Sequence, residues 1–252
     1  MLFRSASSGG SFTDCHNWTL VPPTASDPAR FAIASTYTVT FPSSKTTKNA
    51  SVNLGTATFS LGNKTYTLSS PIATDAYLSV GGSLGASLKM VSGTVTAPYC
   101  RVGYAASETG TLNVGSGGKL IATTDLCVGC AGTGTMNVTS GGRVTTSEAT
   151  IGASIGGSGT VSLSGSLSKW IGNLGIDVRR GTLKIMSPAT VDVPNVPLVV
   201  FQGGTVRGTG TVNGDIANFG DGSDGTCGLE PGAGTTGALV GTFNVEIGRA
   251  HV

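Results

Sequence analysis

Three acidic residues are the candidates for acid–base chemistry in this chain. Cleavage of a glycosidic bond requires two carboxyl groups within reach of one another, one to give a proton and one to accept a proton or attack. Asp125 stands alone among Thr and Leu, whereas Glu148 lies further along at a different phase of the sequence repeat. Asp177 is followed by two arginines instead of a second acid. We therefore expect separate, solvated carboxylates and predict no catalytic residues.

The cysteines and histidines offer little for nucleophilic, redox or metal chemistry. The five cysteines have no regular spacing and fit no common zinc pattern; they are Cys15, Cys100, Cys127, Cys130 and Cys227. Redox CxxC pairs usually sit where a helix begins, and nothing helical follows Cys130. We expect Cys127 and Cys130 to be ordinary wall residues, and the sequence leaves cysteine pairing open. A catalytic triad or metal site would depend on His16 alone, which we interpret as a cap residue beside Cys15.

Three further segments could bind ligands. Gly220–Gly225 holds two aspartates in a flexible loop, but it lacks both the calcium-binding nonapeptide repeat and the distal Glu of an EF-hand, so a plain turn is favoured over calcium. Trp18 and Trp170 could stack on sugar rings, although core packing is the commoner use of tryptophan. Thr109-Gly-Thr111 and Thr133-Gly-Thr135 suggest a threonine ladder, as in ice-binding solenoids, but the segment 151–160 does not extend it cleanly, and threonine is also a good strand former. We predict no metal and no cofactor.

Composition narrows the class of protein. The 252 residues include 40 Gly and are 11% charged, with a net charge of +2, so disorder driven by charge is not expected. No basic run interleaves with aromatic residues, which argues against nucleic acid as a partner. Hydrophobic residues are scattered singly, without the contiguous apolar stretch of a transmembrane helix.

The sequence predicts an all-β fold. Short β-branched alternations such as Tyr37–Phe41 are separated by Gly-rich turns, and no window has helical periodicity. The central third repeats itself: Gly110-Thr-Leu-Asn-Val returns from Gly134 and again, as Gly-Thr-Val-Ser-Leu, from Gly159, at intervals of 24 and 25 residues. A hydrophobic–glycine pair precedes each copy. Gly117-Gly-Lys-Leu120 follows the first copy and Gly141-Gly-Arg-Val144 the second. Three marks that keep one phase indicate a structural repeat.

Such a unit cannot enclose a core singly, so successive units must coil and stack. We predict a right-handed parallel β-helix of roughly ten rungs at about 4.8 Å each, with glycines at its corners. Strand alternation places Leu112, Met136 and Val161 in one inward column, with Thr111 and Asn113 facing outward.

The flanks are less regular than the repeats. Residues 11 to 70 carry hairpin-like segments and most of the aromatic residues, as expected of a capping region, and 193–197 predicts a corner or irregular loop. We divide the chain into a disordered or truncated start (1–10), an N-terminal cap with first rungs (11–75), solenoid repeats (76–185), irregular rungs (186–245) and a non-native, adaptor-like tail (246–252). A signal peptide is missing and the natural protein is expected to continue beyond Val245, with an open strand edge that associates end to end or frays.

The repeat resembles that of autotransporter (type V secretion) passengers and of PEP-CTERM-sorted surface proteins, over about residues 78 to 185. The segments that carry the resemblance are 126–144, 151–154 and 157–163, with support from Asn17-Trp18, Pro22-Pro23, Asp27, Phe31, 210–216, Glu230-Pro-Gly232 and Gly237. The resemblance implies a β-helical extracellular passenger and does not imply an activity. No translocator barrel or sorting tail is present, so the anchor to the cell surface is left open.

From these observations we expect a non-catalytic structural or adhesive passenger at a bacterial cell surface. Its partners would be glycans or further copies of itself, bound by a polar Thr/Asn/Ser wall of low charge. The alternative is a carbohydrate-active β-helix enzyme, a polysaccharide lyase or glycoside hydrolase. In a structure, two carboxylates converging in one groove would favour the enzyme, and dispersed carboxylates would favour the passenger.

Overall fold

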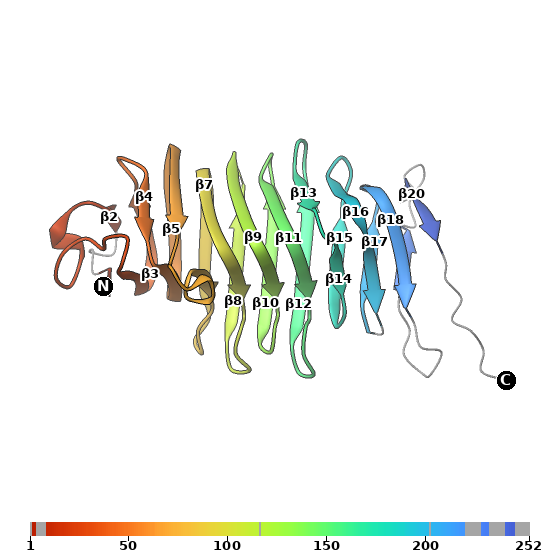
Figure 1. The fold of residues 1–252 in the computed structure, drawn as a ribbon, viewed down its shortest axis with the longest axis horizontal. Coiled ribbons are helices and arrows are strands. Elements are labelled where there is room, and N and C mark those ends of the chain that lie inside the picture. Colours follow the sequence, from red (N-terminus) through yellow and green to blue (C-terminus); the bar gives the residue numbers. More distant parts are fainter. Residues whose placement is uncertain are drawn as a thin grey trace.

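A computed structural model shows a parallel β-solenoid of about eight turns, so the predicted all-β fold class is confirmed. The turns follow one another along the long axis, from the N-terminal strands to the C-terminal ones (Figure 1). The structure describes residues 2–3, 9–115, 117–201, 203–219, 228–231 and 240–244. The right-handed sense of the coil stays a prediction.

The elements are strands apart from two short 3-10 turns, η1 (Cys15–Asn17) and η2 (Ala73–Asp75). Neither of these helical turns has the length or apolarity to cross a bilayer, and no other helix lies within the described ranges. The strands are β1 (Leu2–Phe3), β2 (Gly9–Ser11), β3 (Pro28–Thr40), β4 (Lys45–Thr47), β5 (Asn49–Leu68), β6 (Tyr77–Val80), β7 (Ala86–Val102), β8 (Thr109–Val114), β9 (Gly118–Val128), β10 (Thr133–Thr139), β11 (Arg143–Ile151), β12 (Ser158–Ser164), β13 (Lys169–Gly172), β14 (Ile176–Val178), β15 (Gly181–Ile185), β16 (Thr190–Phe201), β17 (Thr205–Gly208), β18 (Thr211–Phe219), β19 (Gly228–Pro231) and β20 (Val240–Asn244).

Each central turn contributes to three faces of the rod. The repeat face is the stack of β8, β10, β12, β15 and β17. The second face comprises residues 94–97 of β7, 118–122 of β9, 143–146 of β11, β13 and 190–193 of β16. The third face comprises β6, 99–102 of β7, 125–128 of β9, 148–151 of β11 and β14.

The predicted interior column is confirmed. Leu112 pairs with Met136 and Met136 with Val161 in consecutive parallel strands, and all three side chains are fully buried. Burial of each such side chain contributes about 1.5–3 kcal/mol. Because alternate residues face outward, Thr111 and Asn113 reach the surface of the repeat face. The repeat therefore stacks like residues in register inside the rod.

The hydrophobic–glycine pairs mark one corner of the coil. Gly103, Gly129 and Gly152 stand on three successive turns and have φ angles of 64°, 71° and 71°. A Cβ on Gly129 would lie 2.1 Å from the carbonyl oxygen of Ser158 on the next turn. Both the left-handed backbone and the close approach require glycine at this corner.

Strand lengths and pairing differ from the prediction in two ways. Short strands were expected, but β5 spans 20 residues because the chain bends round corners without leaving the sheet. Register shifts, such as that between Phe59 and Ser60, mark these bends. The hairpin-like N-terminal segments are also a wrong prediction, since β3 and β5 pair in parallel. The N-terminal segment and the central repeats therefore belong to the same coil.

The number of turns is about eight, fewer than the ten predicted. The separation between residues on neighbouring turns varies: 24 residues between Asn113 and Asn137, but 28 between Asn53 and Gly81. At about 4.8 Å per turn the rod is about 40 Å long. The segment 193–197 is indeed a corner, because the pairing of β16 with β18 shifts between Val193 and Leu198.

The N-terminal end of the rod has an aromatic core. Phe12 stacks on Phe41 with ring centroids 4.9 Å apart and meets Trp18 edge-on at 5.0 Å. The Trp18 indole donates a hydrogen bond to the backbone oxygen of Phe12 at 2.8 Å. Large rings here cover the end of the interior column, where a turn has a neighbour on one side only.

Candidate functional site

A shallow groove of about 580 Å³ crosses the N-terminal half of the third face and the adjoining ends of β3 and β5. Its lining is polar and aromatic and contains both signs of charge. The lining residues are Pro28, Arg30, Asn49, Ser51, Asn53, Tyr77, Ser79, Arg101, Tyr104 and Glu108. No one of these residues was singled out from the sequence, because they come from segments that lie far apart along the chain.

Strand register brings the aromatic residues of the groove together. β6 pairs with β7 so that Tyr77 lies beside Tyr99 and Ser79 beside Arg101. Between these outward residues, Cys100 points inward and is fully buried. Burial, with a smaller contribution from the nearby Asp125 charge, raises the pKa of the Cys100 thiol to about 12. The thiol therefore stays protonated and serves as core.

Arg101 is the centre of an aromatic cluster. Its guanidinium carbon lies 4.5 Å from the ring centroid of Tyr104, 5.0 Å from that of Tyr77 and 5.6 Å from that of Tyr99. Each distance is within the range of a cation–π interaction. The Tyr104 side chain is 47% exposed, so one ring of the cluster is open to a ligand. The cluster holds a cation and tyrosine faces in one fixed arrangement.

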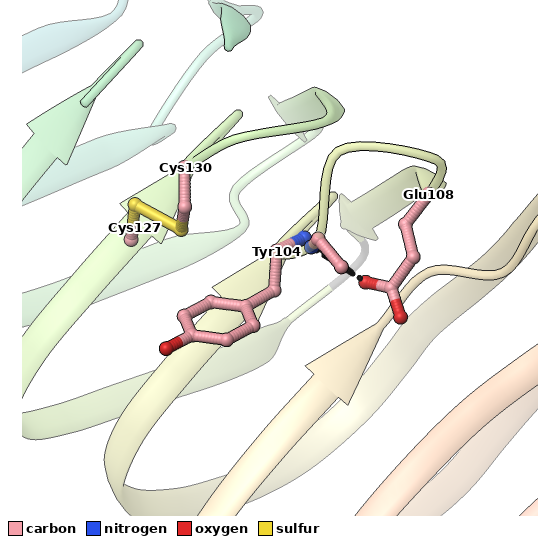
Figure 2. Close-up of a disulfide and its surroundings, with 5 residues drawn as sticks. Tyr104, Glu108, Cys127 and Cys130 are labelled. Atoms are coloured by element: carbon pink, nitrogen blue, oxygen red, sulfur yellow. Dashed lines mark hydrogen bonds between the residues drawn. A yellow bond between two sulfur atoms is a disulfide. The ribbon is translucent and has the colours of Figure 1, made fainter. Parts of the chain in front are cut away.

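The loop that carries Tyr104 is fastened by Glu108. The Glu108 carboxylate accepts hydrogen bonds from the backbone N–H groups of Tyr104 and Ala105, both at 3.1 Å (Figure 2). The Glu108 N–H donates back to the carbonyl oxygen of Ala105 at 2.8 Å. Hydrogen bonds to a charged acceptor are stronger than neutral ones. Glu108 is therefore a positioning residue for the exposed tyrosine.

On the turn after that of Tyr104, a disulfide joins Cys127 to Cys130, beside the Tyr104 loop (Figure 2). Cys127 is in register with Arg101, and the Cys130 N–H donates to the carbonyl oxygen of Gly103 at 3.1 Å. The Ala131 N–H donates to the carbonyl oxygen of Tyr104, also at 3.1 Å. The sequence left cysteine pairing open, and the structure has a disulfide between these two wall residues, next to the Tyr104 loop.

Asp125 and Glu148 lie in register on neighbouring turns, which corrects the expectation that they differ in phase. Thr123 and Thr124 precede Asp125 at the bend of β9, whereas Ser147 alone precedes Glu148 at the bend of β11. The difference of one residue at the bend cancels the offset seen in the sequence. Spacing alone could not reveal this, because a bend can absorb an extra residue without moving the strands on either side.

These two carboxyls continue the aromatic column of the groove. Tyr99 is in register with Asp125, which is half-buried, and Glu148 beyond it is exposed. Burial raises the pKa of the Asp125 carboxyl and the Glu148 charge raises it further, while the Arg101 guanidinium opposes the shift. Two acids with unlike surroundings next to a cation are a combination that can hold and release a proton.

The remaining acidic and histidine candidates are engaged locally. Asp177 binds Arg179, with the carboxylate 2.8 Å from Nη2. His16 lies exposed beside Cys15, as expected, and its Nδ1 is 2.9 Å from the Asp14 carboxylate. Asp14 also accepts from the backbone N–H of His16 and so caps η1. Gly220–Gly225, Cys227 and the tail 246–252 lie outside the described residues.

Both tryptophans are core residues, as the burial argument predicted. Trp18 is 3% exposed and Trp170 fully buried. The Trp170 indole donates to the hydroxyl of Thr146 at 3.2 Å. Neither side chain is available to stack on a sugar.

The threonine ladder of the repeat face extends further than predicted. Thr135 pairs with Thr160 as well as with Thr111, so this column continues, whereas Thr133 pairs with Ser158 and the parallel column is interrupted as expected. The same outward column runs through Thr36, Thr56, Ser87, Thr111, Thr135, Thr160, Thr182 and Thr205. The neighbouring column holds Asn113 and Asn137, linked by a side-chain hydrogen bond of 2.9 Å. A uniform wall of this kind suits a sheet surface, since β-branched residues favour strands.

No protein-family profile, curated protein or solved structure matches this chain.

Proposed function

We propose that the chain is a non-catalytic structural or adhesive rod of a cell surface, which attaches to glycans through the groove around Arg101. The single observation that carries this proposal is the cluster of Tyr77, Tyr99 and Tyr104 about the Arg101 guanidinium, beside a groove whose lining is mostly polar. Tyrosine offers an apolar face to a sugar ring and a hydroxyl to its edge, and arginine offers up to five donors.

Two features support an extracellular location. The repeat resembles those of autotransporter passengers and PEP-CTERM-associated surface proteins, whose rods are displayed outside the cell. The Cys127–Cys130 disulfide is a bond that persists in oxidising compartments and is rare in the cytosol. A stiff rod of stacked turns with few charges suits display and many weak contacts with glycans or with further copies of itself.

The experiment is a binding titration of the purified chain against neutral oligosaccharides, with Tyr104→Ala as the test variant. We expect Tyr104→Ala to weaken binding by about tenfold, since loss of an aromatic contact costs about 1–1.5 kcal/mol. Tyr104→Phe keeps the ring and should retain most of the affinity. Ile155→Ala, at another exposed loop residue, is the matched control.

Absence of binding to every oligosaccharide would contradict the proposal, and so would a Tyr104→Ala variant that binds like the native chain. Thermal unfolding of each variant checks that the fold is intact. Changes at exposed positions are expected to alter stability by no more than about 0.5 kcal/mol.

A second candidate function, a carbohydrate-active enzyme, is favoured by the register of Asp125 with Glu148. A carboxyl with a raised pKa beside an exposed carboxylate is the pairing that general acid–base cleavage requires. Incubation with polysaccharides and detection of new reducing ends or unsaturated products is the direct assay. Turnover that disappears in both Asp125→Asn and Glu148→Gln would replace the non-catalytic proposal.

A further inference from the structure

Three cations form a straight column on the second face. Arg143 on β11 pairs with Lys119 on β9 and with Lys169 on β13. The residues that follow them, Leu120, Val144 and Trp170, are buried, so strand alternation directs the three cationic side chains outward. Neighbouring turns are about 4.8 Å apart, which places one positive charge on each of three consecutive turns.

Among the described residues, a carboxylate is paired with this column at its C-terminal end alone. Lys169 forms an ion pair with Asp192, which also accepts a hydrogen bond from the Asn213 amide at 2.8 Å. Neither Lys119 nor Arg143 forms an ion pair with any acid in the part of the chain that the structure describes, and both are exposed. Like charges directly opposite one another in a sheet are destabilising. Their alignment therefore weakens the fold slightly unless an anion lies against it.

An apolar strip runs beside the cations. Ile121, Thr145 and Ile171 occupy the next outward column on the same three turns, and all three are half-buried. Together with the cationic column they line a small groove of about 140 Å³. A ligand that fits must present regularly spaced negative charges on one edge and C–H groups on the other.

We infer that this strip, Lys119–Arg143–Lys169 with Ile121 and Ile171, binds a linear acidic polysaccharide that runs parallel to the rod axis. The length of a sugar unit in an extended chain is comparable with the spacing between neighbouring turns along the rod axis, so successive carboxylates or sulfates meet successive cations. Sugar rings supply the C–H face that packs on the isoleucines. This strip lies on a different face from the groove around Arg101, and the inference does not depend on that groove.

Charge and composition favour a polysaccharide over nucleic acid. Proteins that bind single-stranded nucleic acid combine a basic groove with aromatic side chains on which bases stack. No aromatic side chain lies in either outward column on these three turns. Duplex DNA carries a charge for every 1.7 Å or so of its axis, a density that three cations on one narrow strip match poorly.

The test measures binding of the native chain to immobilised polygalacturonate, a carboxylated polymer, and to heparin, a sulfated one, across a range of salt concentrations. Uncharged dextran and a DNA duplex are run in parallel. The test variant is Lys119→Gln with Arg143→Gln. The matched control is Lys89→Gln with Lys64→Gln, which removes the same charge from two lysines that lie outside this column.

We expect the native chain to bind at least one acidic polymer, with affinity that falls as salt rises, and not to bind dextran. The test variant should bind about tenfold more weakly and with a shallower salt dependence, because fewer counterions are released. The control should stay within about twofold of the native chain, since it leaves the aligned charges in place. Tyr104→Ala should bind the acidic polymers like the native chain, which separates this strip from the groove.

Three results would overturn the inference. One is a lack of binding to both acidic polymers at low salt. Another is an equal loss in the test and control variants, which would indicate net charge alone. The third is tighter binding to DNA than to either polysaccharide, which would assign the strip to nucleic acid. The test variant should melt at or above the native temperature because like-charge repulsion is removed, so loss of folding cannot imitate loss of binding.

Discussion

The repeat face and the third face are built from the same turns, yet they present different surfaces. On the repeat face, Thr111 is followed by Thr135 and Thr160, so one outward column keeps a single residue type over these three turns. On the third face, by contrast, Tyr99 is followed by Asp125 and then by Glu148. The second face lies between these extremes, with three cations in a column that is otherwise threonine.

The difference between the two faces shows where unlike side chains come together in a coil of repeats. The strands of the repeat face coincide with the regular sequence repeat, so the outward threonines recur at the same spacing as the buried core residues. The third face follows a bend at which the number of residues varies by one, as between β9 and β11. Unlike residues therefore come into register there. Variation is tolerated at this face because its inward residues, such as Leu126 and Ala149, keep the core filled.

The largest expected effect comes from the inward column of the repeat face, which packs in the core that the faces have in common. Leu112→Ala should lower the free energy of unfolding by about 2–5 kcal/mol, because it leaves a cavity among tightly stacked side chains. Chemical denaturation monitored by circular dichroism measures the change. Lys89→Ala, on the outward side of the preceding turn, is the control and should be nearly neutral. A Leu112→Ala variant as stable as the native chain would contradict the shared core.

The next effect concerns the third face alone. Replacing both Cys127 and Cys130 by serine should lower the free energy of unfolding by about 2 kcal/mol, from the entropy of the short loop that the disulfide closes. Reductant should lower the melting temperature of the native chain and leave that of the double variant unchanged. Cys15→Ser, at an exposed free thiol, should behave like the native chain. If reductant lowers the melting temperatures of the native chain and of the double variant equally, the disulfide is not what stabilises the native chain.

A smaller effect is expected on the repeat face. Asn137→Ser removes the side-chain hydrogen bond to Asn113 and should cost about 0.5–1.5 kcal/mol. The backbone should be unaffected, because Ser162 already occupies this position on the following turn. Denaturation measures the cost, and hydrogen exchange of β10 tests the backbone. Loss of amide protection throughout β10 would show that the asparagine ladder has more than a surface role.

The smallest effect is a pH dependence at the third face. The folded-state pKa of Asp125 is raised above the ordinary value of 3.8, so the native state binds its proton more tightly than the unfolded state. The contribution of this carboxyl to stability is therefore present below about pH 3.8 and is lost as pH rises through the folded-state pKa. Solvent limits the size of the effect because the group is half-exposed.

Asp125→Asn tests this sign. Relative to the native chain, the variant should gain stability as pH rises above 3.8, and the two denaturation profiles measured from low to neutral pH should converge at the acidic end. Asp177→Asn is the contrasting variant, because that carboxylate is paired with Arg179 and should lose stability at neutral pH. A native chain that becomes more stable than Asp125→Asn on raising the pH would show that Arg101 outweighs burial and Glu148.

The sequence alone determined the architecture of the repeats. Like residues at a constant spacing, with glycine at one corner, are enough to predict a stacked coil, because a unit of that length cannot bury its apolar face without neighbours. The inward column through Leu112, Met136 and Val161 followed directly from strand alternation. The number of turns was less accurate, since turn length varies where the period is loose, as between Asn53 and Gly81.

The tertiary structure alone decided which surface residues meet. The alignment of Asp125 with Glu148, the tyrosines around Arg101 and the column of Lys119, Arg143 and Lys169 all join residues from different turns. In a coil, neighbours across turns depend on how many residues each bend absorbs, and a change of one residue exchanges one contact for another. Core residues tolerate no such freedom, because a slip of one position would turn an apolar side chain to solvent.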